Sequence, residues 1–324
     1  MLHPDYIHGQ PSVELARLAE TRGLGSIWVP ETWGRDAVSY LARLVLNTSH
    51  IRLATGISPI FNRTPALLAQ TIASLDEMSG GRVIAGLGVS GAKVVEDWHG
   101  QPFQRPLQRT REYVSIVRLA LSGQRVNFEG ELFQLHDFAL LGVRPVQQRV
   151  PIFIAGLGPR NIELAGEIAD GWLPIFLSPR HLPALRARLA TGAARAGRSP
   201  SEVRIAAFVG ACVTDDVDRD RLLLRRHMAY YVGGMGTYYN RLVAETYGYV
   251  EAAAAIQQAW RAGDRAAAAQ HVPDALLDEV CISGPPPAAR ARLEEYLAAG
   301  VSPLLASPHG ASFEDIARTI EAVT

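Results

Sequence analysis

The sequence has few cysteines, and it lacks both a long hydrophobic run and a signal-like N-terminus. Its 324 residues include two cysteines, Cys212 and Cys281, which lie far apart and match no zinc-ligand spacing. We expect them to be free, buried thiols of a cytosolic protein. No apolar run approaches the ~20 residues that a membrane helix needs. Residues 1–9 have neither a positive n-region nor an apolar h-region, so a cytoplasmic rather than a secreted protein is predicted.

An excess of charge of one sign is also missing. The chain has 32 Lys and Arg against 32 Asp and Glu, which gives a formal net charge of zero, and Lys93 is the single lysine. No basic field favours nucleic acid or a membrane surface, so the predicted partner is a small-molecule substrate. His8 and His99 have no partner at metal-ligand spacing, and no metal is expected. The 48% hydrophobic content allows a sizeable core.

Short apolar runs alternate with helical patterns along most of the chain. A weak strand at residues 1–2 is followed by expected strands at 25–30, 51–57, 82–88, 151–155, 171–176, 203–213 and 302–306. Helices are expected at 11–22, 36–48, 64–78, 107–122, 159–169, 180–197, 286–299 and 312–323. Eight strands, each followed by a helix, predict an α/β fold, a (β/α)8 TIM barrel. An open doubly wound sheet with a helical second domain from about residue 214 is the alternative.

Two segments interrupt the alternation. Residues 123–150 are mixed, with a hairpin expected around 127–130. Residues 214–277 are helical and rich in alanine, and they are interpreted as a helical insertion before the last strand of a single domain that spans residues 1–324. The charged run 215–226 predicts a solvated helix face. Tyr230, Tyr231, Tyr238 and Tyr239, around a Gly-Gly pair, would either line a pocket or serve packing and interfaces.

A glycine-rich segment follows the expected strand at 82–88. Gly86-x-Gly88-x-x-Gly91 matches the dinucleotide fingerprint, but here it follows the fourth strand and opens no long helix. A structural glycine turn and a loop that cradles another kind of cofactor remain as interpretations, since glycines let backbone N–H groups approach a ligand. Gly156-Leu157-Gly158 is a second such segment that opens a helix, where a phosphate would bind favourably, although an ordinary helix cap is an equal alternative.

Polar residues in the segments after strands are further candidates for functional residues. Glu31 directly follows the strand at 25–30, where the rim of a barrel would be, and is either functional or a solvated loop carboxylate. His8 and His99 lie in expected loops and are weaker candidates for proton transfer.

Four segments in order resemble the luciferase-like monooxygenase superfamily, and more closely its coenzyme F420-dependent oxidoreductases. They are SIWVPETWGRDA at 26–37, the run from ATGISP to LGVSG at 54–91, DWHGQPF with RTREYV at 97–114, and IAGLGPRNIELAGEIADGWLP at 154–174. The resemblance covers residues 11–180 well and the last 45 more loosely. It does not extend to 214–277.

The resemblance implies a barrel with the deazaflavin across the carboxyl ends of its strands. It places a non-prolyl cis peptide at Gly56–Ile57, behind the ring. The implied cofactor-binding residues are Glu31, Gly56, Ile57, Gly86, Gly88, Val89, Ser90, Gly91, Ala155, Gly156, Leu157 and Gly158. Glu31 and Thr32 are the implied catalytic residues, as aids to proton transfer.

The implied function is hydride transfer between coenzyme F420 and a small organic substrate, for example a pterin-like molecule, by a homodimer. Two departures argue against a sugar-phosphate dehydrogenase. Thr32 stands where many relatives have histidine, and Gly91-Ala92-Lys93 stands where some have glutamate. The alternatives are an FMN-dependent monooxygenase that uses a separate flavin reductase, and a flavin-binding homologue without turnover.

Overall fold

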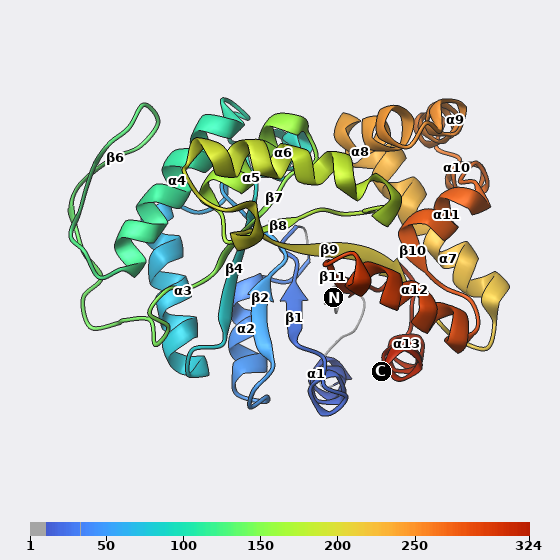
Figure 1. Cartoon of the computed structure of the whole chain (residues 1–324), viewed down its shortest axis with the longest axis horizontal. Coiled ribbons are helices and arrows are strands. Elements are labelled where there is room, and N and C mark those ends of the chain that lie inside the picture. The colour runs from blue at the N-terminus through green and yellow to red at the C-terminus, as the bar shows by residue number, and fades with distance from the viewer. Residues whose placement is uncertain (1–10, 33) are drawn as a thin grey trace.

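A single curled sheet of parallel strands forms the centre of the molecule (Figure 1). The computed structural model describes residues 11–32 and 34–324. The sheet contains β1 Ser26–Val29, β2 Arg52–Thr55, β3 Ser58–Pro59, β4 Val83–Gly88, β7 Ile152–Ala155, β8 Gly171–Leu173, β9 Arg204–Ala211, β10 Cys281–Ile282 and β11 Ser302–Ala306. Its main path runs β1-β2-β4-β7-β8-β9, and β10 and β11 both pair with β9.

The strands follow one another in the sheet as they do in the chain, and every pairing among them is parallel. A doubly wound sheet would reverse its strand order at a switch point. The predicted α/β fold of the TIM-barrel type is therefore confirmed, and the doubly wound alternative is wrong. The expected first strand at residues 1–2 lies outside the described residues.

Helices cover the outer face of the sheet (Figure 1). They are α1 Pro11–Thr21, α2 Ala37–Val45, α3 Pro65–Ser79, α4 Pro106–Leu121, α5 Pro159–Ile168, α6 Leu182–Arg195, α12 Pro286–Ala298 and α13 Phe313–Val323. Helix α3 shows why the sequence predicts them well. Thr64 caps its start by accepting a hydrogen bond from the Leu67 N–H, and Gly80 ends it with a left-handed φ of 68°. No helix in the described ranges is long and apolar enough to cross a membrane.

The inside of the curled sheet is filled by large side chains. Trp28 packs edge-on against Phe153 and Phe208, with ring centroids 5.6 and 6.1 Å apart. Leu173 and Leu304 complete this cluster. Close packing at this level closes the interior and forms a rigid floor below the carboxyl ends of the strands.

The predicted hairpin is present as β5 Val126–Glu129 and β6 Gln134–Phe138, which pair antiparallel. Buried Glu112 of α4 holds its turn by accepting hydrogen bonds from three backbone N–H groups of residues 131–133. The segment between β4 and α4 contains a π-helical turn, Val94–Trp98, in which Val94 and Val95 are buried. The expected strand at 171–176 ends early, and Phe176 has a left-handed φ of 52°.

Helices occupy the segment predicted as an insertion. Between β9 and β11 lie α7 Val217–Ala229, α8 Thr237–Arg241, α9 Val250–Arg261, α10 Arg265–Gln270 and α11 Asp274–Val280, with π-helical turns at Tyr230–Gly234 and Leu242–Thr246. They share a separate apolar core. The division of the chain into one domain with an insertion stays a prediction.

The expectation of a solvated face at 215–226 is wrong for Asp220. This carboxylate is fully buried and accepts hydrogen bonds from the Thr214 N–H and hydroxyl, at 2.7 and 2.9 Å. It also accepts one from the Cys212 thiol at 3.2 Å. Cys212 and Cys281 are both free and buried, as predicted.

Candidate functional site

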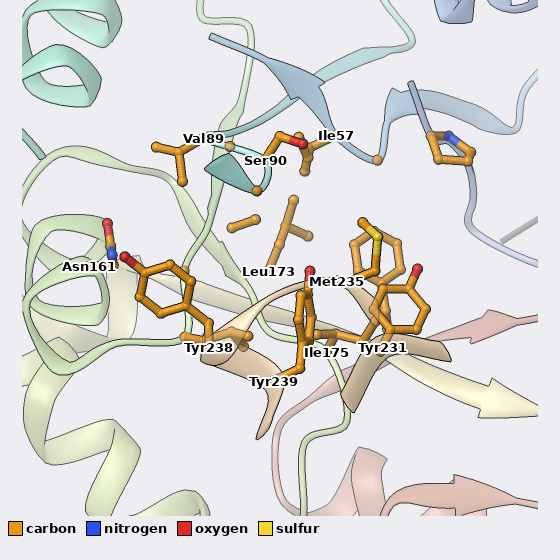
Figure 2. A pocket seen from close by; sticks show the side chains of 18 of the residues that line it. Ile57, Val89, Ser90, Asn161, Leu173, Ile175, Tyr231, Met235, Tyr238 and Tyr239 are labelled. Carbon is orange, nitrogen blue, oxygen red and sulfur yellow. The ribbon is translucent and has the colours of Figure 1, made fainter. Parts of the chain in front are cut away.

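A pocket of about 1180 Å³, including the solvent in its mouth, lies across the carboxyl ends of the strands. One wall is the barrel rim, which we define as Pro30–Thr32, Gly56–Ile57, Gly88–Gly91, Ala155–Gly158 and Asn161. The opposite wall is the insertion wall, which we define as Tyr231, Met235, Tyr238 and Tyr239 (Figure 2). Leu173, Ile175 and Phe208 line the pocket between them. This is the end of a barrel where active sites are built.

The structure brings together nearly all the residues that the resemblance implied for the site. Glu31, Thr32, Gly56, Ile57, Gly88, Val89, Ser90, Gly91, Ala155, Gly156, Leu157 and Gly158 all line this pocket. Their roles in binding and catalysis stay predictions. Sequence reasoning from the resemblance missed Asn161 and left the insertion tyrosines undecided, although the Tyr-rich run at 230–239 was a visible signal.

Gly86 is the exception, because it is not among the lining residues. It lies inside β4, and a Cβ there would be 2.0 Å from the Thr55 carbonyl oxygen and 2.9 Å from the Trp28 ring. The Thr55 hydroxyl also donates a hydrogen bond to the Gly86 carbonyl at 2.7 Å and accepts one from the Gly86 N–H at 2.9 Å. Glycine at this position permits close strand packing below the pocket, and its assignment to the cofactor stays a prediction.

The peptide bond Gly56–Ile57 is cis, as the resemblance implied. The Gly56 N–H donates to the Val29 carbonyl at 2.7 Å, and a Cβ on Gly56 would stand 3.0 Å from the Phe208 ring. Ile57 faces the pocket (Figure 2) and packs on Gly88, whose Cβ would be 3.1 Å from the Ile57 Cδ1. The rim here is a flat apolar surface that depends on the missing side chain of Gly88.

The segment 156–161 forms one end of the pocket, where α5 begins. Gly158 is the N-cap and Pro159, which has no N–H, is the first helical residue. The Asn161 N–H donates to the Gly158 carbonyl at 2.9 Å, so the first turn offers the N–H of Arg160 to a ligand. Trp172 anchors the loop by donating its indole N–H to the Gly156 carbonyl at 2.8 Å. A helix N-terminus of this kind suits a phosphate. Arg160 lines a different hollow, between α4, α5 and α6, and not this pocket.

The Glu31 side chain is held by two hydrogen-bond donors. Arg63 Nη2 is 2.7 Å from its Oε1, and the Ser58 hydroxyl is 3.1 Å from its Oε2. The same Arg63 nitrogen lies 2.5 Å from Asp36 Oδ2. Hydrogen bonding to Glu31 is the main reason that the pKa of Arg63 is raised above its usual value. The pairing fixes the orientation of the Glu31 carboxyl group at the rim.

The histidines stand away from the lining. His99 lies 3.1 Å from the Asn62 amide through its Nε2, is exposed, and is absent from the pocket wall. His8 lies outside the described residues. Across the described part of the chain, no group of three or more His, Cys, Asp or Glu side chains could hold a metal ion.

Comparison with known proteins gives consistent results. Residues 4–302 match the family model of the luciferase-like monooxygenases. The chain is 37% identical over 309 residues to a putative coenzyme F420-dependent oxidoreductase of Mycobacterium tuberculosis, covering 90% of this chain and 89% of the relative. It is 32% identical over 323 residues to the 5,10-methylenetetrahydromethanopterin reductase of Methanolobus tindarius, covering 98% and 97%.

A solved structure agrees over nearly the whole chain. The coenzyme F420-dependent tetrahydromethanopterin reductase of Methanopyrus kandleri superposes with a TM-score of 0.86 at 28% identity. The match covers 99% of this chain and 95% of that one. The similarity therefore includes the insertion, which the sequence resemblance did not reach.

Proposed function

The chain belongs to the luciferase-like monooxygenase family, and within it we propose that the protein is a coenzyme F420-dependent oxidoreductase. One observation carries the proposal. The residues that the resemblance implied for deazaflavin binding, apart from Gly86, line one pocket at the carboxyl ends of the strands. The relatives named as F420-dependent, at 37% identity over nine-tenths of the chain, support the same cofactor.

The residues present fit such a cofactor. Ile57 and the bare backbone of Gly88 would hold the flat ring system, because a Cβ on Gly88 would crowd both Ile57 and Ala155, at 3.1 and 3.3 Å. Gly156, Gly158 and the start of α5 would hold its phosphate, since the Arg160 N–H and the helix dipole attract an anion. The rim thus offers an apolar wall at one place and backbone donors at another.

When bound, the deazaflavin supplies the hydride chemistry, as a two-electron carrier. The side chains of this protein orient the reactants and exclude water. Glu31, fixed by Arg63 and Ser58, presents a carboxylate at the rim, and the hydroxyl of Thr32 lines the pocket beside it. Their part in proton transfer remains a proposal, as does the small organic substrate. A cytoplasmic homodimer belongs to the same proposal.

A binding titration tests the cofactor. Purified protein is titrated with F420 and, separately, with FMN, and quenching of tryptophan fluorescence is followed; Trp28 and Trp172 lie directly beneath the pocket. We expect saturable binding of F420 that excludes FMN. Tight binding of FMN without a response to F420 would instead identify a flavin-dependent monooxygenase. Hydride transfer is then tested with reduced F420 and a panel of carbonyl and imine acceptors.

A further inference from the structure

The insertion wall has a composition unlike that of the rim. Its four lining side chains are three tyrosines and a methionine. They are carried by the π-helical turn Tyr230–Gly234, by Met235 directly after it, and by the start of α8. If the rim holds the cofactor, as proposed above, the insertion wall is the surface left for the substrate. The inference that follows rests on that proposed function.

Charge is scarce around this pocket. Among the described lining residues there is no Arg, Lys or His, and Glu31 is the one carboxylate, already paired with Arg63. A phosphate or carboxylate on the substrate would lose its hydration here without gaining a cation. Aromatic rings and the Met235 thioether instead offer flat, polarisable contact area. These features favour an uncharged, flat substrate.

Tyr239 supplies the polar group in this apolar surrounding. Its ring stands edge-on to Tyr231 at 5.0 Å, and Tyr231 packs in turn on Phe176 at 5.4 Å. Figure 2 shows the Tyr239 ring directed from the insertion into the pocket, towards the rim. Tyr238, in contrast, is 44% exposed and extends towards Asn161.

The hydroxyl of Tyr239 forms no hydrogen bond with any described residue. Three buried tyrosines do: Tyr113, Tyr247 and Tyr296 each donate to a backbone carbonyl, at 3.2, 2.6 and 2.7 Å, whereas Tyr239 is half-buried. Burial raises the pKa of Tyr239 to about 12, so the hydroxyl keeps its proton at neutral pH. A protonated donor without a partner, in a pocket wall, is suited to an acceptor atom on a ligand.

We propose that this pocket takes uncharged, flat, conjugated molecules with a carbonyl or imine acceptor atom, and that the Tyr239 hydroxyl recognises that atom by donating a hydrogen bond. Tyr239 is then a specificity-determining residue on the insertion wall.

A matched set of ligands separates shape, charge and hydrogen bonding. Indole-3-carbaldehyde is flat and neutral with an acceptor, indole-3-carboxylate is its anion-bearing counterpart, and 3-methylindole lacks the acceptor. Glucose 6-phosphate represents sugar phosphates. Binding of each to the F420-loaded protein is measured by calorimetry. We expect the aldehyde to bind about tenfold more tightly than the other three, a difference of about 1.4 kcal/mol, because it alone is uncharged, flat and able to accept a hydrogen bond from Tyr239.

Two variants locate the hydrogen bond. Tyr239→Phe is expected to weaken the aldehyde about tenfold, while the affinities for 3-methylindole and F420 stay unchanged. Tyr249→Phe is the control, since Tyr249 lies on the insertion but bonds to Glu279 at 3.3 Å, away from the pocket. It should alter none of these affinities.

The possible results separate failure of the proposed F420-dependent function from failure of the substrate class or of the Tyr239 contact. Failure of the wild-type protein to bind F420 overturns the proposed function and the inference with it. Normal F420 binding together with preference for the carboxylate or the sugar phosphate overturns only the substrate class. Normal F420 binding with equal aldehyde affinity in Tyr239→Phe and wild type overturns the role of Tyr239.

Discussion

The two walls of the pocket are built in opposite ways. The barrel rim consists of glycines and backbone at strand ends, supported from below by Trp28, Phe153 and Phe208. The insertion wall consists of large side chains on short helical segments that have their own core. A rim of backbone is set by the sheet and suits a constant cofactor. A wall of side chains can change by substitution and suits a variable substrate.

The largest effect is expected from filling the rim. Gly88→Val places methyl groups against Ile57 and Ala155, where even a Cβ would be 3.1 and 3.3 Å away. We expect F420 affinity to fall about 100-fold or more, which corresponds to about 2.7 kcal/mol. Gly25→Val is the matched control, because a Cβ at Gly25 meets no atom within 4 Å. Equal F420 titration curves for the two variants would show that the ring does not lie on this wall.

Removing the support of the insertion wall should have the next largest effect. Trp260 packs against Gly233 and Gly234, where a Cβ would in each case be 2.7 Å from its ring system, and against Tyr230 at 5.7 Å between ring centroids. Trp260→Ala is expected to destabilise the fold by about 2 kcal/mol. Indole-3-carbaldehyde binding should weaken more than F420 binding. Leu297→Ala, at an exposed site on α12, is the control. An equal loss of both ligands would contradict the division of the pocket into two walls.

A substitution at the amino end of the barrel should lower the stability of the fold without changing either wall of the pocket. Asp170 accepts hydrogen bonds from Arg118 at 2.6 Å and from the Ile152 N–H at 2.7 Å. Burial alone would raise the pKa of Asp170, but the Arg118 charge and these hydrogen bonds outweigh it and lower the pKa. A lowered pKa contributes stability above the unfolded value of about 3.9, and this stability is lost as the pH falls through the folded value.

We therefore expect Asp170→Asn to lose about 2 kcal/mol of stability at pH 7. The difference from wild type should shrink as the pH falls below about 4, because the wild-type carboxylate becomes protonated only as the pH falls through its lowered pKa. Thermal melts of both proteins from pH 7 down to about pH 3 measure this difference in stability. The affinity of the variant for F420 at pH 7 is expected to change little. Asp215→Asn, 93% exposed in its ion pair, is the control. A constant difference across the pH range would show that the Asp170 charge is unimportant.

The smallest effect is expected at the ion pair behind the rim. Arg63→Met removes the guanidinium that orients Glu31 and leaves two carboxylates, Glu31 and Asp36, without their shared partner. F420 affinity should fall about fivefold, by less than the 1.4 kcal/mol of a tenfold change, because Ser58 still holds one Glu31 oxygen. Arg63→Lys should retain part of the F420 affinity that Arg63→Met loses. Arg160→Met is the control, because Arg160 lies outside the pocket, and it should leave F420 affinity unchanged. If Arg160→Met lost more F420 affinity than Arg63→Met, the anionic end of the cofactor would lie in the hollow that Arg160 lines.

Local patterns were sufficient for most elements of the barrel. Helix α3 begins at Thr64-Pro65 and ends at Gly80, because capping and left-handed glycine are properties of a few neighbouring residues. The resemblance likewise located the rim, whose glycines lie in contiguous motifs. Element ends were less predictable: the expected strand at 171–176 stops at Leu173, as burial and backbone bonding decide where pairing ends.

By itself, then, the sequence determined the order of strands and helices, the parallel sheet and the rim motifs, because hydrophobic periodicity and glycine chemistry act over short distances. The tertiary structure alone decided which residues from distant segments meet. It buried Gly86 below the pocket rather than in it, joined Glu31 to Arg63 across 32 residues, and turned Tyr239 into the pocket. Such choices depend on packing between elements, which leaves no mark in the local pattern of either partner.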